Sequence, residues 1–152
     1  MIQFENTIDI HCPIEKVFQF VADFENIPKW NYYVMQVRLV SGGSPAVNTV
    51  YHQIRKEDEQ DFQIVDYQPN HKIAIKTTTG STPAFLRTFT FEEVNNNTRI
   101  VDVWELETGH NRLVEALGKS RISAVVVENL GKLKQLLETG ETQLQDGRMS
   151  RL

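Results

Sequence analysis

Six short runs of alternating apolar and polar residues between positions 35 and 107 constrain the fold most. Met35, Val37 and Leu39, for example, are alternate residues separated by polar ones, so they have the same parity and would lie on one face of a strand. Turn-forming residues separate the runs at 41–45, 58–59, 69–70, 80–81 and 95–97. Such connections are shorter than a parallel crossover, which needs about a dozen residues or more. The pattern therefore predicts antiparallel neighbouring strands at 35–39, 48–56, 60–68, 71–79, 84–94 and 98–107.

Elements of other kinds precede and follow these strands. Residues 2–10 predict a seventh strand, because the residues of one parity are mostly apolar. From Pro13 the apolar spacing becomes helical, and Pro28 ends this helix or opens a second short one. Residues 111–138 predict one long helix with an apolar stripe through Ile122, Val126, Leu130, Leu133 and Leu137.

The order of these elements predicts an α+β fold in a single domain of residues 1–138. A seven-stranded antiparallel sheet has to cover its apolar face, and the C-terminal helix is the only long element that can do so. We therefore expect a curved sheet around that helix, with two short helices after the first strand. Residues 139–152 show no apolar period, which predicts a flexible polar tail.

Composition excludes several classes of function. A net charge of -4 and a pI of about 5.6 argue against nucleic-acid binding. The N-terminal residues lack the apolar run of a signal peptide, no segment is apolar enough to span a membrane, and Cys12 is the single cysteine. These features predict a cytoplasmic protein. No close metal-ligand spacing and no glycine-rich phosphate loop occurs, so we expect neither a metal nor a cofactor.

A resemblance to a known superfamily follows from the segment VFQFVADFENIPKWN, with Val17-Phe18, Asp23, Pro28 and Trp30 as its most specific residues. Together with Pro69 at a strand end and the turn NNNTRI, it resembles the helix-grip superfamily. That superfamily (SRPBCC) includes START domains, birch-pollen-type allergens, and polyketide cyclase, dehydrase and lipid transport proteins. The resemblance implies a pocket for an apolar ligand between the sheet and the long helix. The turn at Gly42-Gly43 is shorter than the allergens' glycine-rich loop, so contacts made by that loop are not expected here.

Arg87 and Asp102 form the most notable polar pattern. Each shares its parity with apolar residues, Arg87 with Phe85 and Phe89 and Asp102 with Trp104, and the two lie on neighbouring predicted strands. Buried charges need a partner, so these two are expected to pair with each other or with a polar ligand. Arg87 is then either an anchor for a carbonyl or carboxylate or part of a structural ion pair. Asp102 faces water if Val101 and Val103 point inward instead.

His52 is a weaker candidate for chemistry, as a general base if its strand turns it into the pocket. A strand histidine held by a neighbouring side chain is the alternative, and His11, His71 and His110 are expected at exposed ends of elements. Trp30 suits a packing anchor, whereas Tyr32 and Tyr33 suit either the pocket or the surface. The predicted ligand-binding residues are Trp30, Tyr33, Phe62, Val65, Phe85, Arg87, Phe89, Asp102, Trp104 and Ile122.

Three functions fit these observations. The favoured hypothesis is a binding protein for a hydrophobic small molecule, such as a lipid, polyketide or isoprenoid, in a cavity of several hundred cubic ångströms. The second is a polyketide cyclase or dehydratase-like enzyme in which Arg87, Asp102 and His52 position the substrate or move protons. The third is a module that binds a protein partner through its surface, and the sequence leaves a homodimer open.

Overall fold

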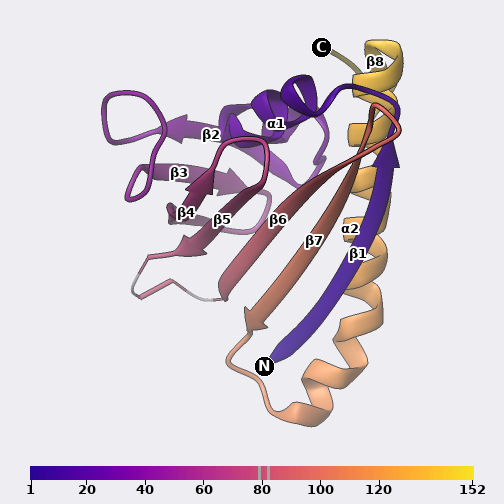
Figure 1. Cartoon of the computed structure of the whole chain (residues 1–152). Helices are drawn as coiled ribbons and strands as arrows, with labels where there is room; N and C mark the ends of the chain where they lie inside the picture. The colour runs from indigo at the N-terminus through magenta and orange to yellow at the C-terminus, as the bar shows by residue number, and fades with distance from the viewer. Residues whose placement is uncertain (79, 82) are drawn as a thin grey trace.

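A computed structural model of the chain describes residues 1–78, 80–81 and 83–152 (Figure 1). Residue 79, the last of the predicted strand 71–79, lies outside the described residues. The elements are β1 (Ile2–Ile10), α1 (Ile14–Ala22), η1 (Phe24–Lys29), β2 (Val34–Leu39), β3 (Val50–Arg55), β4 (Glu59–Gln68), β5 (Lys72–Thr77), β6 (Ala84–Val94), β7 (Asn97–Glu107), α2 (Arg112–Thr139), β8 (Glu141–Gln143) and β9 (Met149–Arg151).

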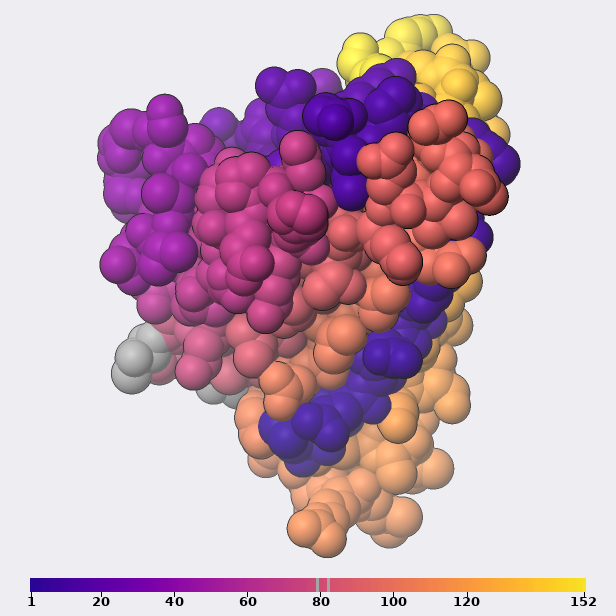
Figure 2. All heavy atoms as spheres, in the orientation of Figure 1, coloured from indigo at the N-terminus to yellow at the C-terminus, as the bar shows by residue number. Residues whose placement is uncertain are grey.

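Strands β1 to β7 form one antiparallel sheet in the order β1-β7-β6-β5-β4-β3-β2. Strands β2 to β5 run in a different direction from β1, β6 and β7, so the sheet is strongly curved (Figure 1). The long helix α2 packs chiefly along β1, and its first turns project past the sheet (Figure 1 and Figure 2). The predicted α+β helix-grip architecture is confirmed.

The two short helices close one end of the sheet. Helix α1 buries Ile14, Val17, Phe18 and Val21, which share one face at helical spacing. Pro13 lies just before this helix with extended backbone angles, one residue earlier than its predicted place at the first helical position. Pro28 lies inside the 3-10 helix η1 and therefore belongs to the second short helix. Trp30 follows η1 and is almost fully buried, as a packing anchor would be.

Strands β2 and β4 each contain a β-bulge, and two side chains predicted to face inward lie on the outer face instead. The register of β2 on β3 shifts between Val34 and Gln36, and the Met35 side chain is 64% exposed instead of facing the sheet interior. The register of β4 on β5 shifts in the same way between Ile64 and Asp66, and Val65 is exposed. A bulge leaves one residue without a partner in the ladder and changes the alternation of faces. The predicted inward position of Val65 is also wrong, because Phe62 and Ile64 are buried and the alternation along β4 turns Val65 to the outer face.

Aromatic side chains fill the core between the short helices and strands β3, β4 and β6. Phe24 contacts Tyr51 and Phe62 edge to face, and Tyr51 stacks on Phe62 with ring centroids 5.4 Å apart. Burial raises the pKa of Tyr51 to about 12, so its phenol stays neutral. Phe62 continues this core toward Phe85. This end of the fold is thus filled with side chains.

The residues after α2 form a small hairpin of β8 and β9, where the sequence predicts a tail without regular structure. Gly140 ends α2 in a left-handed conformation with φ of 89°, which turns the chain back. The hairpin buries Thr142 and Leu144. Burial of Leu144 gives the hairpin an apolar contact, and a contact made by one side chain produces no period in the sequence.

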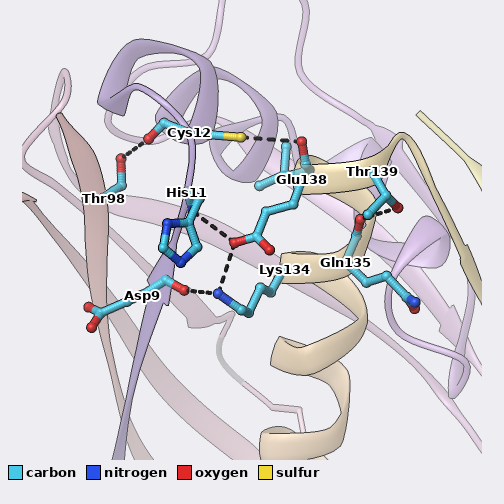
Figure 3. A network of polar contacts seen from close by, with 9 residues as sticks. Asp9, His11, Cys12, Thr98, Lys134, Gln135, Glu138 and Thr139 are labelled. Carbon is cyan, nitrogen blue, oxygen red and sulfur yellow. Dashed lines mark hydrogen bonds and ion pairs between the residues drawn. The ribbon is translucent and has the colours of Figure 1, made fainter.

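Polar contacts fix the last turns of α2 against the end of β1 (Figure 3). The Lys134 ammonium donates to the carbonyl of Asp9 at 2.5 Å and to the Glu138 carboxylate at 2.8 Å. Glu138 also accepts from the backbone amide of His11, and the Cys12 thiol donates to the carbonyl of Leu137 at 3.2 Å. These contacts set the position of α2 along β1, and with it the helix wall of the cavity described below.

Candidate functional site

A cavity of about 420 Å³ lies between the sheet and α2. Most of its wall is apolar and comprises Ile27, Val34, Ile75, Pro83, Phe85, Trp104, Leu106, Ile122, Val125 and Val126. Its polar lining comprises Gln53, Arg55, Arg87, Thr108 and His110. His110 is exposed, so the cavity reaches the surface where β7 leads into α2. Concave, mainly apolar sites with a few polar groups are typical of small-molecule binding.

Arg87 and Asp102 form a bidentate ion pair at the cavity wall. The Arg87 Nε atom lies 2.8 Å from Asp102 Oδ1, and Nη2 lies 2.6 Å from Oδ2. Arg87 is 5% exposed and Asp102 is fully buried. The register aligns Arg87 with Trp104 and Phe89 with Asp102, so the pair is diagonal across β6 and β7. The predicted alternative of a water-facing Asp102 is excluded.

Aromatic rings surround the guanidinium group of Arg87. Its central carbon lies 4.4 Å from the ring centroids of both Phe89 and Trp104 and 5.6 Å from that of Trp30. The Trp104 indole also donates weakly to Asp102 Oδ2 at 3.4 Å. Among the described residues, the hydrogen bonds of Arg87 use only Nε and Nη2. The Nη1 donors therefore remain available to a ligand in the cavity that Arg87 lines.

A second polar group in the wall is a pair of buried amides. Gln53 on β3 donates to the side-chain carbonyl of Gln60 on β4 at 2.9 Å. Gln60 in turn donates to the backbone carbonyl of Pro83 at 3.1 Å. These bonds hold the Gln53 amide in one orientation at the cavity, on the far side of the sheet's bend from β1.

The predicted ligand-binding residues fall into three groups. Phe85, Arg87, Trp104 and Ile122 line the cavity. Four others are buried behind the wall instead of lining it, and these are Trp30, Phe62, Phe89 and Asp102. Tyr33 and Val65 are exposed and do not line it. Tyr33 lies instead in a surface depression with Lys56.

His52 points away from the cavity, and its predicted role as a general base there is wrong. Tyr51 and Gln53 on the same strand face inward, so His52 lies on the outer face of the sheet. Its Nδ1 lies 2.5 Å from Asp61 and its Nε2 lies 2.7 Å from Glu59. Hydrogen bonds to Asp61 and then Glu59 raise the pKa of His52 above its usual value. The structure agrees with the alternative prediction, in which neighbouring side chains hold His52.

His52 should make the stability of the protein depend on pH. Because its pKa is raised in the folded state, its contribution is complete below the usual histidine pKa of about 6.5 and is lost as pH rises through the folded value. We expect His52→Gln to lower the free energy of unfolding by up to about 1 kcal/mol near pH 6 and by less near pH 9. Urea unfolding at both pH values measures this. A difference that grows with pH would contradict the assignment.

Several lining residues escape the sequence prediction. Gln53 lies on the same face of β3 as Tyr51, opposite to the face of His52. Assigning the Tyr51 face to the interior would have identified Gln53 as a lining residue. Val125 lies one turn from Ile122 on α2, and this spacing is a usable signal. Thr108 and His110 belong to the connection between β7 and α2, where no periodicity indicates a direction.

Two findings concern the part of the chain that the structure describes. There, no group of three or more His, Cys, Asp or Glu side chains is placed to bind a metal ion. Nor does any helix described by the structure have the length and apolar character needed to cross a membrane.

The chain is similar in fold to several solved structures. The protein XoxI from Bacillus cereus is 15% identical with a TM-score of 0.71, and the match covers 90% of this chain and 96% of that one. DynU16, from the dynemicin biosynthetic locus, is 14% identical with a TM-score of 0.70, covering 92% of this chain and 48% of that one. The aromatase/cyclase StfQ from the steffimycin biosynthetic pathway is 15% identical with a TM-score of 0.68, covering 89% and 44%.

Sequence comparison is decisive for the family. No curated protein matches the chain. A family model described as "Polyketide cyclase / dehydrase and lipid transport" matches residues 1–138, which include all of the seven-stranded sheet and nearly all of α2. The chain therefore belongs to the polyketide cyclase/dehydrase and lipid transport family.

Proposed function

We propose that the protein binds a neutral, mainly apolar small molecule in the cavity between the sheet and α2, with a carbonyl oxygen facing Arg87. The observation that carries this proposal is a buried arginine with spare N–H donors in an otherwise mostly apolar wall. The cavity volume of about 420 Å³ falls in the range of small-molecule sites, which is about 300–1,000 Å³.

The charge of the site favours a neutral ligand. Asp102 already compensates the Arg87 charge through two short hydrogen bonds. A ligand carboxylate at Arg87 would bring a second anion close to the buried Asp102 and would lose its own hydration. A ketone or ester oxygen accepts a hydrogen bond from Nη1 without adding charge. Of the two acceptor groups predicted from the sequence, the carbonyl is thus preferred over the carboxylate.

The family description and the size of the site suggest the ligand class. Lipids, polyketides and isoprenoids include neutral molecules with long apolar stretches and few oxygens. A ligand of about 20 heavy atoms that gains about 0.3 kcal/mol per atom would bind with a dissociation constant of tens of micromolar. This affinity suits a carrier that has to release its ligand.

A cyclase or dehydratase-like enzyme that uses the same cavity is the second candidate. The family description and the fold similarity to StfQ favour it, and so does His110 at the cavity rim, because a histidine ring can hydrogen-bond a polar group of a substrate. In this case Arg87 would polarise a substrate carbonyl, and the cavity would fold the chain for ring closure. Loss of turnover in His110→Gln with unchanged ligand affinity would favour the enzyme over the carrier.

Native mass spectrometry of protein purified gently from its own host tests the binding function. We expect a neutral apolar compound containing a carbonyl group at close to one molecule per chain, which denaturing extraction then identifies. A defined anionic ligand would contradict the charge argument. A protein that is empty and that also fails to bind an added methyl naphthyl ketone would contradict the binding function itself.

A further inference from the structure

Three side-chain amides have buried atoms without a hydrogen-bond partner among the described residues, namely Asn6, Asn129 and, in the C-terminal hairpin, Gln145. Two of these amides concern the region of the cavity. They are the side-chain nitrogen Nδ2 of Asn6 on β1 and the side-chain oxygen Oδ1 of Asn129 on α2. Asn129 is only 4% exposed. A buried donor or acceptor without a partner destabilises the fold, so native structures usually satisfy such atoms with protein, water or ligand. One donor and one acceptor thus lack partners on the facing sides of two elements that pack together.

The two amides lie at the same level along β1 and α2. Contacts fix both ends of the pairing, with Glu115 at the amino group of Met1 and Lys134 at the carbonyl of Asp9. The helix rises about 28 Å from Glu115 to Lys134, and the strand advances about 27 Å over the matching residues. The two lengths are nearly equal, so residues at the same fraction of each length lie side by side. This places Asn129 beside the stretch of β1 from Asn6 to Ile8.

Asn6 and Asn129 do not line the cavity themselves, but each lies next to a residue of its wall or to the partner of such a residue. On α2, Val125 and Val126 line the cavity, and Asn129 follows them one turn later on the same helix face. On the sheet, Asn6 is directly opposite Asp102 in the ladder of β1 and β7, and Asp102 holds Arg87 in the cavity wall. The unpartnered donor and acceptor therefore lie immediately past the cavity's inner end, in the layer next to Val126 and Asp102.

We propose that the ligand reaches past the cavity lining to Asn6 and Asn129, which together bind one of its hydroxyl groups. This inference rests on the proposed ligand-binding function and narrows its ligand class to hydroxylated carbonyl compounds. A hydroxyl group matches both amides, because its oxygen accepts from Asn6 Nδ2 and its hydrogen donates to Asn129 Oδ1. An ether or a carboxylate can only accept, and an ammonium group can only donate, so each leaves one amide unsatisfied.

Binding of β-naphthol and of its methyl ether, measured by isothermal titration calorimetry, tests the inference. The two probes share an aromatic body and differ in the hydroxyl hydrogen. We expect wild-type protein to bind β-naphthol about tenfold more tightly. Asn129→Leu should reduce this preference to less than about twofold, and so should Asn6→Leu. Val127→Leu, on the outer face of the same helix, serves as the matched control and should keep the wild-type preference.

The outcomes separate this inference from the function on which it rests. Equal binding of both probes by wild-type protein would overturn the hydroxyl position and leave the binding function intact. Binding of neither probe would overturn both. The comparison in wild-type protein is sufficient even if a variant does not fold.

Stability of the ligand-free protein gives a second readout. If the two amides only pair with each other to hold α2 on β1, Asn129→Leu will lower the melting temperature and leave the probe preference unchanged. We expect the opposite result, a melting temperature equal to or above that of wild-type protein, because leucine removes an unpaired buried acceptor. A lower melting temperature with an unchanged preference would overturn the inference.

Discussion

Replacing Arg87 by methionine will lower the free energy of unfolding by about 3–5 kcal/mol. The substitution removes the only cation that the structure places in contact with Asp102 among the described residues, and Asp102 is fully buried. Breaking a buried ion pair by deleting one partner leaves an uncompensated charge, and measured losses are of this size. Urea unfolding followed by circular dichroism at neutral pH measures the change.

The double variant Arg87→Met with Asp102→Leu is the control. Replacement of a buried pair by apolar residues of similar size is often neutral or stabilising, so the double variant should recover most of the loss. A single variant that loses less than about 1 kcal/mol, or a double variant as unstable as the single one, would contradict a charge-based role for the pair.

This expectation changes how the pair can be used in functional tests. If the protein is an enzyme, the sequence alone predicts that Arg87→Ala or Asp102→Asn abolishes turnover and leaves the fold intact. The buried bidentate geometry makes both substitutions structurally damaging. Arg87→Lys is a better probe, because it keeps the charge beside Asp102 but loses the planar donor geometry.

Filling the cavity should abolish ligand binding. Val125 lines the cavity from α2 and is half-buried, so a tryptophan at this position would occupy much of the space of about 420 Å³. We expect Val125→Trp to weaken the binding of the neutral dye Nile red by more than about tenfold. Its stability should stay within about 1 kcal/mol of wild type, because the new ring enters existing space instead of a packed core. Fluorescence titration measures the dissociation constant.

Val127→Trp is the matched control for this experiment. Val127 lies on the outer face of α2, where its side chain is 52% exposed. The same tryptophan added there should leave Nile red affinity unchanged. Equal affinities of wild type, Val125→Trp and Val127→Trp would mean that the dye binds elsewhere, and the cavity would lose its functional assignment.

Local pattern accounts for what the sequence predicts well. Strand β6 runs from Ala84 to Val94, as predicted, because its alternation is regular and the Asn95 to Asn97 turn fixes its end. The same regular alternation turned Arg87 and Asp102 to the interior face of neighbouring strands. Their pairing could therefore be anticipated from parity and turn length, apart from the diagonal register.

Long-range packing accounts for what the sequence could not supply. The bulge in β2 turns Met35 outward against the predicted alternation, and its position depends on the partner strand β3. The apolar residues at both parities of β3, such as Tyr51 and Ile54, gave no basis for turning His52 outward. The predicted lining also includes residues such as Phe62 and Phe89, which are buried behind the cavity wall, because parity shows the face but not the depth of a side chain.

Nitrogen-proton correlation NMR during titration with methyl β-naphthyl ketone tests the ligand site most directly. We predict saturable shifts at the backbone amides of Phe85, Val125 and Val126, together with the Arg87 Nε and Trp104 indole signals. Signals on the outer faces, such as those of His52 and Val127, should not move. Saturable shifts confined to the outer faces, or none at all at millimolar ketone, would contradict a ligand site between the sheet and α2.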